Sequence, residues 1–165
     1  MSALFFFDSR ERKNEHIKRY FDKHGIPYTV TKLDAGDYMR TGCRVTVDRK
    51  QNIEEISRNL TNTKDKQRFW NEVRLAYKMG LRLVVLVETN KYKSVSDLRF
   101  WKSKYTSVHG GALVREMERL RLAYGVQFMF CPRVSMAKTI IDLLGGAADE
   151  LRGRNQIQAD GKGSV

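Results

Sequence analysis

The sequence contains little of what marks a disulfide scaffold, a fibrous chain or a membrane protein. Its two cysteines, Cys43 and Cys131, lie far apart without metal-ligand spacing, which favours a reducing compartment. Two prolines and 12 glycines exclude collagen-like and proline-rich chains. The longest apolar runs, Ala3 to Phe7 and Leu83 to Val87, are far shorter than the roughly 20 residues of a membrane-spanning helix. We therefore expect no membrane partner, and the first residues lack the basic region of a secretory signal.

Negative charge is scarce relative to positive charge. The 165 residues include 31 Lys and Arg against 19 Asp and Glu, a formal net charge of +12. Such an excess favours a polyanionic partner, above all nucleic acid, although a merely soluble basic protein is the alternative that charge alone leaves open. Hydrophobic residues make up 41% of the chain, enough for one core. We expect one domain over residues 1–146 and a flexible tail over residues 147–165, which is short of apolar residues.

Short apolar runs alternate with segments of helical periodicity. Strands are predicted at residues 4–7, 28–31, 83–87 and 126–130, and helices at residues 11–24, 53–60, 69–80, 112–124 and 135–144. A hairpin turning at Thr41-Gly42 is predicted to join strands near Tyr38 and Val45. Residues 61–66 are polar and are predicted to form a loop, and residues 90–109 follow neither periodicity. The pattern predicts an α/β fold with a mixed sheet, and the wholly apolar run at 83–87 requires helices on both faces.

The predicted hairpin brings acidic residues and a lysine together. Side chains alternate along a strand, so Asp48 and Lys50 project from one face, roughly 7 Å apart at the backbone, while Arg49 points the other way. If the hairpin pairs across its turn, Asp37 approaches Asp48. An Asp-x-Lys sequence at a strand end is also common as a solvated surface pair. The combination with Asp37, and with Asp8 after the first strand, favours a functional cluster.

Two carboxylates and a lysine in one place suit phosphodiester hydrolysis. Mg²⁺ binds one or two carboxylates together with phosphate oxygens and water. The ion polarises the phosphate and lowers the pKa of bound water. A nearby lysine offsets the negative charge that develops in the transition state. The predicted cofactor is therefore Mg²⁺, or Mn²⁺ in its place.

Three short elements resemble the nuclease domain of the XPF/Hef structure-specific endonucleases. They are Asp8-Ser9-Arg10-Glu11, Gly36-Asp37-Tyr38, and Val47-Asp48-Arg49-Lys50 followed by Glu54. The resemblance covers roughly residues 4–145 and implies a restriction-endonuclease-like fold of the PD-(D/E)xK group. Asp48 replaces the family's usual glutamate, and Glu54 replaces its usual final aspartate. The family's larger members carry tandem helix-hairpin-helix modules after this domain, and we expect none in the residues that follow Gly145.

The resemblance implies a role for each matching residue. Asp37 and Asp48 would be the metal ligands, and Lys50 the catalytic lysine. The remaining catalytic positions would be Asp8, Arg10, Glu11, Arg49 and Glu54. Related nuclease domains dimerise through their last helices, which makes a homodimer through Met136, Ile140 and Leu144 a possible assembly, with burial in the monomer as the alternative.

Basic residues interleaved with aromatic residues mark the candidate DNA-binding surface. Lysines alternate with Tyr92, Phe100, Trp101 and Tyr105, a pattern suited to frayed or single strands, although these aromatic side chains could instead pack on the core. The candidate DNA-binding residues are Arg12, Lys13, Arg68, Lys91, Lys93, Lys102 and Lys104.

The leading hypothesis is a Mg²⁺-dependent DNA endonuclease that cuts branched, forked or flapped DNA. One alternative is a catalytically degenerate DNA-binding or scaffold module on a nuclease fold, and another is a resolvase of Holliday junctions. The expected location is the cytoplasm of a prokaryotic cell or a phage-infected host, or the nucleus of a eukaryote.

Overall fold

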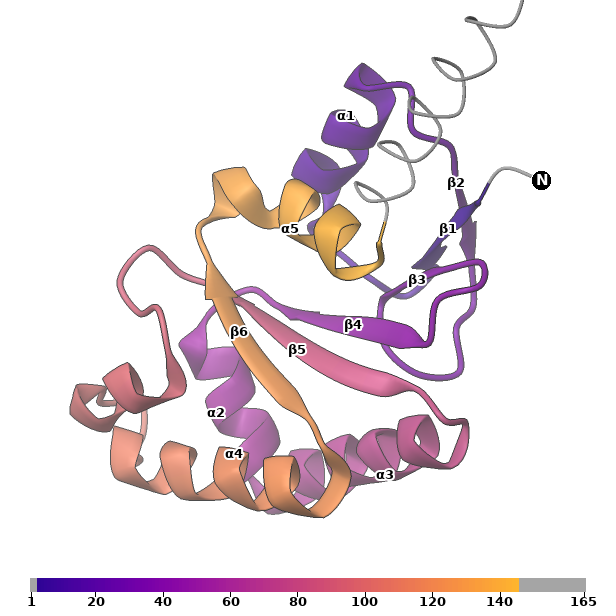
Figure 1. The fold of residues 1–165 in the computed structure, drawn as a ribbon. Helices are drawn as coiled ribbons and strands as arrows, with labels where there is room; N and C mark the ends of the chain where they lie inside the picture. The colour runs from indigo at the N-terminus through magenta and orange to yellow at the C-terminus, as the bar shows by residue number, and fades with distance from the viewer. Residues whose placement is uncertain (1–2, 146–165) are drawn as a thin grey trace, which may run out of the picture.

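Alternating short strands and amphipathic helices build a six-stranded mixed sheet in the computed structural model, which describes residues 3–145 (Figure 1). The strands are β1 (Phe5–Asp8), β2 (Tyr28–Thr31), β3 (Tyr38–Arg40), β4 (Val45–Lys50), β5 (Arg82–Glu88) and β6 (Gln127–Cys131). The helices are α1 (Glu15–Lys23), α2 (Ile53–Thr61), α3 (Thr63–Lys78), α4 (Gly110–Tyr124) and α5 (Met136–Leu143), with 3-10 turns η1 (Val95–Phe100) and η2 (Arg133–Ser135). The predicted tail, residues 147–165, lies outside the described residues.

The sheet has an antiparallel centre and a parallel half. Its strand order is β2-β1-β3-β4-β5-β6, in which β3 pairs antiparallel with both β1 and β4. Strands β4, β5 and β6 run parallel, and β2 runs parallel to β1. The predicted hairpin is confirmed, because Tyr38 on β3 pairs with Val47 on β4. The hairpin therefore lies at the middle of the sheet rather than at an edge.

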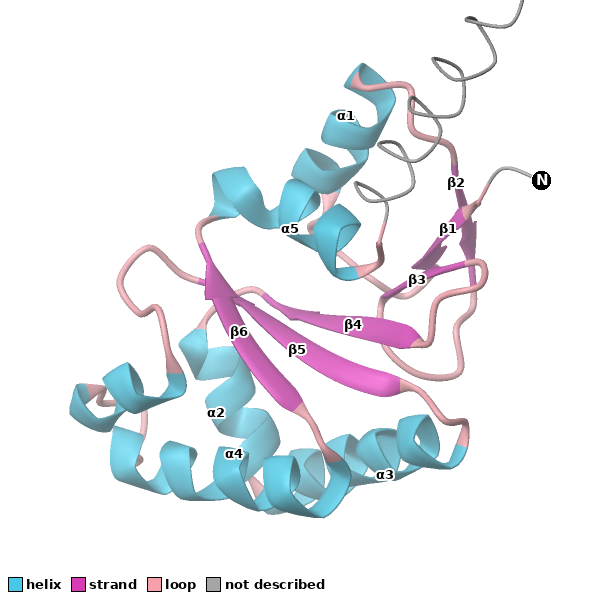
Figure 2. Ribbon diagram, viewed as in Figure 1, coloured by secondary structure: helices cyan, strands magenta, loops and turns pink. Residues whose placement is uncertain are grey.

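Helices cover both faces of the sheet, as predicted (Figures 1 and 2). Helices α2, α3 and α4 lie on one face, and α1 and α5 lie on the other. Strand β5 serves both layers, because Val85 and Val87 join the core under α2–α4, whereas Val84 and Leu86 join the core under α1 and α5. The apolar run at 83–87 is buried throughout. No helix among residues 3–145 is long and apolar enough to cross a membrane.

Helix α3 begins earlier than predicted, and three apolar side chains in or next to the last helix are buried in the monomer. The loop predicted at residues 61–66 is wrong, since α3 already begins at Thr63. The Asn62 side chain accepts a hydrogen bond from the backbone N–H of Asp65 and caps the helix, so these polar residues form its first turn. In α5 and just after it, Met136, Ile140 and Leu144 are fully buried in the monomer. These three side chains are therefore unavailable to a second subunit in this conformation.

Candidate active site

Three predicted acids lie in a row across the middle of the sheet. Phe7 on β1 pairs with Tyr38 on β3, and Tyr38 pairs with Val47 on β4. The residues beside them, Asp8, Asp37 and Asp48, therefore face one another across β1, β3 and β4. The Asp8 N–H donates to the Asp37 carbonyl at 2.8 Å, and the Asp37 N–H donates to the Val47 carbonyl at 2.7 Å.

Asp48 and Lys50 form a buried ion pair on the α3 side of β4. The Lys50 Nζ lies 3.0 Å from Asp48 Oδ2, and only 3% of Asp48 and 8% of Lys50 is exposed. The Lys50 ammonium also lies 5.2 Å from the centre of the Phe69 ring on α3. Strand alternation places the two residues on one face, as expected. Their burial is inconsistent with a solvated surface pair.

Asp37 completes the cluster from the neighbouring strand. Its Oδ2 accepts a hydrogen bond from the Arg49 backbone N–H at 2.8 Å, which fixes the carboxylate at the end of β4. Burial, followed by the nearby carboxylates of Asp48 and Glu11, raises the pKa of Asp37 well above its usual range. Burial opposes the charge on Lys50, but the Asp48 and Asp37 carboxylates outweigh it and raise the lysine pKa. The site therefore holds one protonated lysine among closely spaced carboxylates.

Glu72 is a further acid at this site that sequence reasoning missed. It lies on α3, and its Oε1 accepts a hydrogen bond from the Gly36 N–H at 2.9 Å. Burial and the Asp48 carboxylate raise the pKa of Glu72. The signal was present in the sequence, since Glu72 falls within the apolar stripe Phe69, Val73, Ala76 at helical spacing. A carboxylate within a core-facing stripe indicates a buried polar site.

The turn before Asp37 depends on Gly36. This residue has a φ of +74°, which favours glycine, and a Cβ there would collide with the Thr46 side chain. Thr46 Oγ1 in turn donates to the Ala35 carbonyl at 2.8 Å. Together with the Glu72 hydrogen bond, these contacts fix the segment that presents Asp37 to Asp48.

The donor set suits a divalent cation. Asp48 Oδ2 is buried and accepts no hydrogen bond, so its compensation is the ion pair with Lys50. Burial, followed by the Asp48 and Glu11 carboxylates, raises the pKa of Asp37, and a bound cation would favour its ionised form. Among residues 3–145, no three or more His, Cys, Asp and Glu side chains form a cage that could hold a metal ion. Mg²⁺ needs no such cage, because one or two carboxylates suffice when water and phosphate supply the other ligands.

Asp8 and Arg10 lie beside this cluster but are engaged elsewhere. Asp8 Oδ1 accepts a hydrogen bond from the Leu33 backbone N–H at 2.8 Å. Its Oδ2 pairs with Arg10 Nε at 3.0 Å, and Arg10 also donates to the Leu33 carbonyl at 2.7 Å. The two side chains thus hold the loop after β2 against the end of β1. The Asp8 backbone is hydrogen-bonded to Asp37, whereas the Asp8 carboxylate binds the loop after β2.

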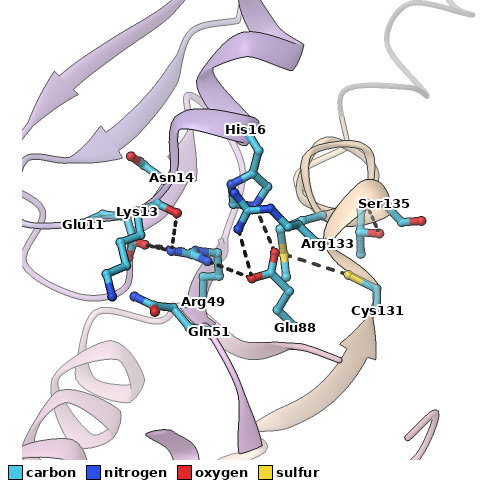
Figure 3. A network of polar contacts seen from close by, with 12 residues as sticks. Glu11, Lys13, Asn14, His16, Arg49, Gln51, Glu88, Cys131, Arg133 and Ser135 are labelled. Atoms are coloured by element: carbon cyan, nitrogen blue, oxygen red, sulfur yellow. Dashed lines mark hydrogen bonds and ion pairs between the residues drawn. The ribbon is translucent and has the colours of Figure 1, made fainter. Parts of the chain in front are cut away.

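Arg49 organises a separate network on the opposite face of β4 (Figure 3). Its guanidinium lies 2.6 Å from Glu11 Oε1 and 3.4 Å from Glu88 Oε2, and only 1% of the side chain is exposed. It also donates to the carbonyls of Arg12 and Lys13 at 2.8 and 3.3 Å. Lys13 has a φ of +54°, so the guanidinium stabilises a strained turn just before α1, which begins at Glu15 rather than at the predicted residue 11.

Glu88 extends this network to His16 and Arg133, which the sequence reasoning did not identify. Glu88 Oε1 lies 3.0 Å from His16 Nε2, and Arg133 approaches Glu88 Oε2 at 4.0 Å (Figure 3). Burial raises the pKa of Glu11, and the Arg49 charge only partly offsets this effect. The predicted shell residues Glu11 and Arg49 therefore lie in a layer that adjoins the Asp37–Asp48 cluster, since the Glu11 carboxylate also acts on Asp37.

Glu54 contacts a loop that lies about 50 residues further along the chain. Its Oε2 accepts from Ser103 Oγ and its Oε1 from the Lys104 backbone N–H, both at 2.9 Å.

The predicted DNA-binding side chains are all exposed, and they come from three regions: the loop before α1, helix α3, and the segments on either side of η1. These residues are Arg12, Lys13, Arg68, Lys91, Lys93, Lys102 and Lys104.

A family model described as the ERCC4 domain matches residues 7–144. The chain belongs to the ERCC4 domain family. This membership confirms the resemblance to XPF/Hef nuclease domains that the three motifs indicated, and ERCC4 domains are nuclease domains. No protein with a curated description matches the chain.

Solved structures agree with this ERCC4 assignment at the level of the fold. The structure of XPF from Aeropyrum pernix is similar over 94% of this chain and 70% of that chain, with a TM-score of 0.67 and 17% identity. A second structure, XPF from Aeropyrum pernix in complex with DNA, matches over 90% of this chain and 66% of that chain, with a TM-score of 0.63 and 17% identity. The ERCC4 domain described here therefore has the predicted restriction-endonuclease-like fold.

Proposed function

We propose that this ERCC4 domain is a divalent-metal-dependent DNA endonuclease whose active centre is Asp37, Asp48 and Lys50. The observation that supports it best is the buried Asp48–Lys50 ion pair at the end of β4, with the half-buried Asp37 carboxylate facing it from the neighbouring strand. Bringing carboxylates together away from water is costly unless a cation compensates their negative charge. The net charge of +12 provides the complementary surface for a polyanion.

The proposed roles follow from the chemistry of each group. Asp37 and Asp48 would hold Mg²⁺ or Mn²⁺, which when bound activates water and polarises the scissile phosphate. Lys50 carries a raised pKa, so it acts as a fixed positive charge beside the phosphate rather than as a general base. Water adds to phosphorus as the bond to the leaving oxygen breaks, and the products are a phosphate monoester and a free hydroxyl. Glu72 and Gly36 position Asp37 through the hydrogen bond between them.

The proposed substrate is DNA with branched or unpaired parts. Exposed lysines flank η1, and exposed Phe100 and Tyr105 lie among them. Cations bind the backbone of any strand, whereas exposed aromatic rings gain most from bases that are not paired. This combination supports forks, flaps and junctions over plain duplex.

The test is cleavage of labelled fork, flap, junction and duplex DNA by the wild-type chain and two variants. Asp48→Asn and Lys50→Met should lose cutting by roughly 100-fold or more, because each removes a charge that acts on the reacting phosphate. Binding to the same DNA in chelator should persist. Lys78→Ala is the matched control, since Lys78 is an exposed lysine at the far end of α3.

A metal titration separates the nuclease from a DNA-binding module on the same fold. Mg²⁺ or Mn²⁺ at about 100 times its Kd should stabilise the folded chain by about 2.7 kcal/mol. Asp37→Asn should abolish most of this stabilisation. Unchanged cleavage by both Asp48→Asn and Lys50→Met would end the assignment of the active centre. Absence of cleavage and of any metal-induced stabilisation in the wild type would identify a catalytically degenerate binding module.

A further inference from the structure

A pocket lies next to the proposed active centre, at the carboxyl ends of β4 and β5. It has a volume of about 600 Å³. That volume falls within the roughly 300–1,000 Å³ of typical ligand sites. One wall begins at Asn52, two residues beyond Lys50, and continues along the first turns of α2 to Arg58. The rest of the lining comes from Glu88 and Thr89 and from the 101–110 loop, which runs from η1 into the first residue of α4. The pocket is therefore a short distance along the chain from the catalytic lysine.

Backbone hydrogen bonds and close packing order the 101–110 loop. The Ser103 N–H donates to the Val108 carbonyl at 2.9 Å, and the Gly110 N–H donates to the Trp101 carbonyl at 2.7 Å. Lys102 forms a β-bridge with His109. The Leu98 carbonyl packs so closely on Gly110 that no Cβ fits there. These contacts fix both ends of the loop and leave its tip exposed to solvent.

Glu54 fixes the tip of this loop over the pocket. Both of its carboxylate oxygens are occupied, one by Ser103 Oγ and one by the Lys104 N–H. The Ser103 hydroxyl oxygen then accepts the N–H groups of Tyr105 and Thr106, each at 3.1 Å. Tyr105 is thereby held in place by its backbone, although 82% of the residue is exposed. An exposed aromatic ring on a pinned backbone is preorganised for stacking.

The charges lining the pocket favour a phosphate chain. Three cations line it, Arg58, Lys102 and Lys104, and their side-chain charges form no ion pair or hydrogen bond with other residues among 3–145. The two acids in the lining are engaged internally, Glu54 with the loop and Glu88 with Arg49 and His16. Three cations against two carboxylates leave the lining with a net positive charge beside an exposed aromatic ring.

We infer that this pocket binds an unpaired segment of a DNA strand, with phosphates on Arg58, Lys102 and Lys104 and a base stacked on Tyr105. This inference rests on the proposed nuclease function, and it places a single-stranded part of the substrate next to the catalytic centre. Glu54 is then a positioning residue, which acts on DNA through the loop that it anchors. Because every base has an aromatic face, the pocket accepts any sequence.

Binding is tested in chelator, so that hydrolysis contributes nothing, with labelled short oligothymidylate and a duplex of equal length as the two probes. Tyr105→Ala should weaken oligothymidylate binding by about 10-fold and leave duplex binding nearly unchanged. Tyr77→Ala is the matched control, because Tyr77 is also exposed but lies on α3, outside the pocket. Lys102→Ala combined with Lys104→Ala should lower the slope of log K against log salt by about 1.4 for the single strand.

Glu54→Gln tests whether Glu54 affects DNA binding through the order of the loop or only through its negative charge. Removal of an acid next to DNA should strengthen binding if Glu54 acts only through its charge. If Glu54 orders the loop, the variant keeps only one of the two oxygens that accept from Ser103 Oγ and the Lys104 N–H, and it binds the single strand more weakly. Thermal unfolding of each variant verifies that it remains folded.

Each result decides the inference. Wild-type affinity of Tyr105→Ala for oligothymidylate would overturn it, as would an equal loss for single strand and duplex, which would indicate contact with duplex backbone instead. Tighter binding by Glu54→Gln would remove Glu54 from the role of positioning residue. These outcomes are distinct from failure of the proposed function, because the latter is measured by cleavage in the Asp48 and Lys50 variants.

Discussion

Replacement of Arg49 tests how strongly the rear face of the sheet supports the candidate active site. Arg49→Met keeps much of the length of the side chain but removes its five hydrogen bonds to carboxylates and loop carbonyls. Glu11 and Glu88 then remain in a partly buried site without this countercharge, and the carbonyls of Arg12 and Lys13 lose a donor. Loss of one partner from a buried pair costs about 3–5 kcal/mol. For a domain of this size, that corresponds to a fall in Tm of roughly 6–20 °C.

The assay is thermal and urea unfolding in chelator at neutral pH, with Arg119→Met as the control. Arg119 pairs with Glu116 on the surface of α4 and is largely exposed, so its replacement should cost at most about 1 kcal/mol. The penalty of Arg49→Met should shrink as the pH falls toward about 5, because burial raises the pKa of Glu11 and this carboxyl, once deprived of Arg49, takes up a proton. A Tm within about 2 °C of wild type at neutral pH would refute the supporting role of Arg49.

Two further predictions concern the backbone and the pH response. Gly36→Ala should lower Tm by clearly more than Gly42→Ala, since both residues have a positive φ but only Gly36 lacks room for a Cβ; equal losses would contradict the packing argument. Burial lowers the pKa of His16, so protonation favours the unfolded chain, and stability should fall as the pH drops below about 6.5. His16→Gln should flatten that part of the pH–stability curve, and an unaltered curve would assign the titration to other groups. The charged groups facing His16 are Glu88, which opposes the shift, and Arg133 and Arg49, which add to it.

The sequence could predict the centre of the site because local rules govern it. A hairpin turning at Thr41-Gly42 sets which residues of β3 and β4 face each other, so the approach of Asp37 to Asp48 followed from the turn. Strand alternation placed Lys50 with Asp48 and Arg49 on the other face. Both inferences need only neighbouring segments of the chain.

The rest of the site depends on packing between segments that are far apart in the sequence, and local sequence patterns do not predict these contacts. Glu72 reaches Gly36 because α3 packs against the hairpin, and the direction of that packing cannot be read from the helix alone. Asp8 lies beside Asp37 as predicted, but the Leu33 N–H captures its carboxylate. Glu54 contacts the 101–110 loop, a segment whose sequence shows no clear periodicity.

The last three residues of β4 have an evolutionary consequence. Asp48 and Lys50 contribute to one layer while Arg49, between them, anchors the other. Insertion or deletion of a single residue in this strand would exchange the two sides, placing a guanidinium among the acids and a carboxylate in the wrong network. Natural selection for chemistry and selection for a stable scaffold therefore act on the same three adjacent codons. Drift in the length of this strand should be rare among descendants, even where loops elsewhere grow and shrink freely.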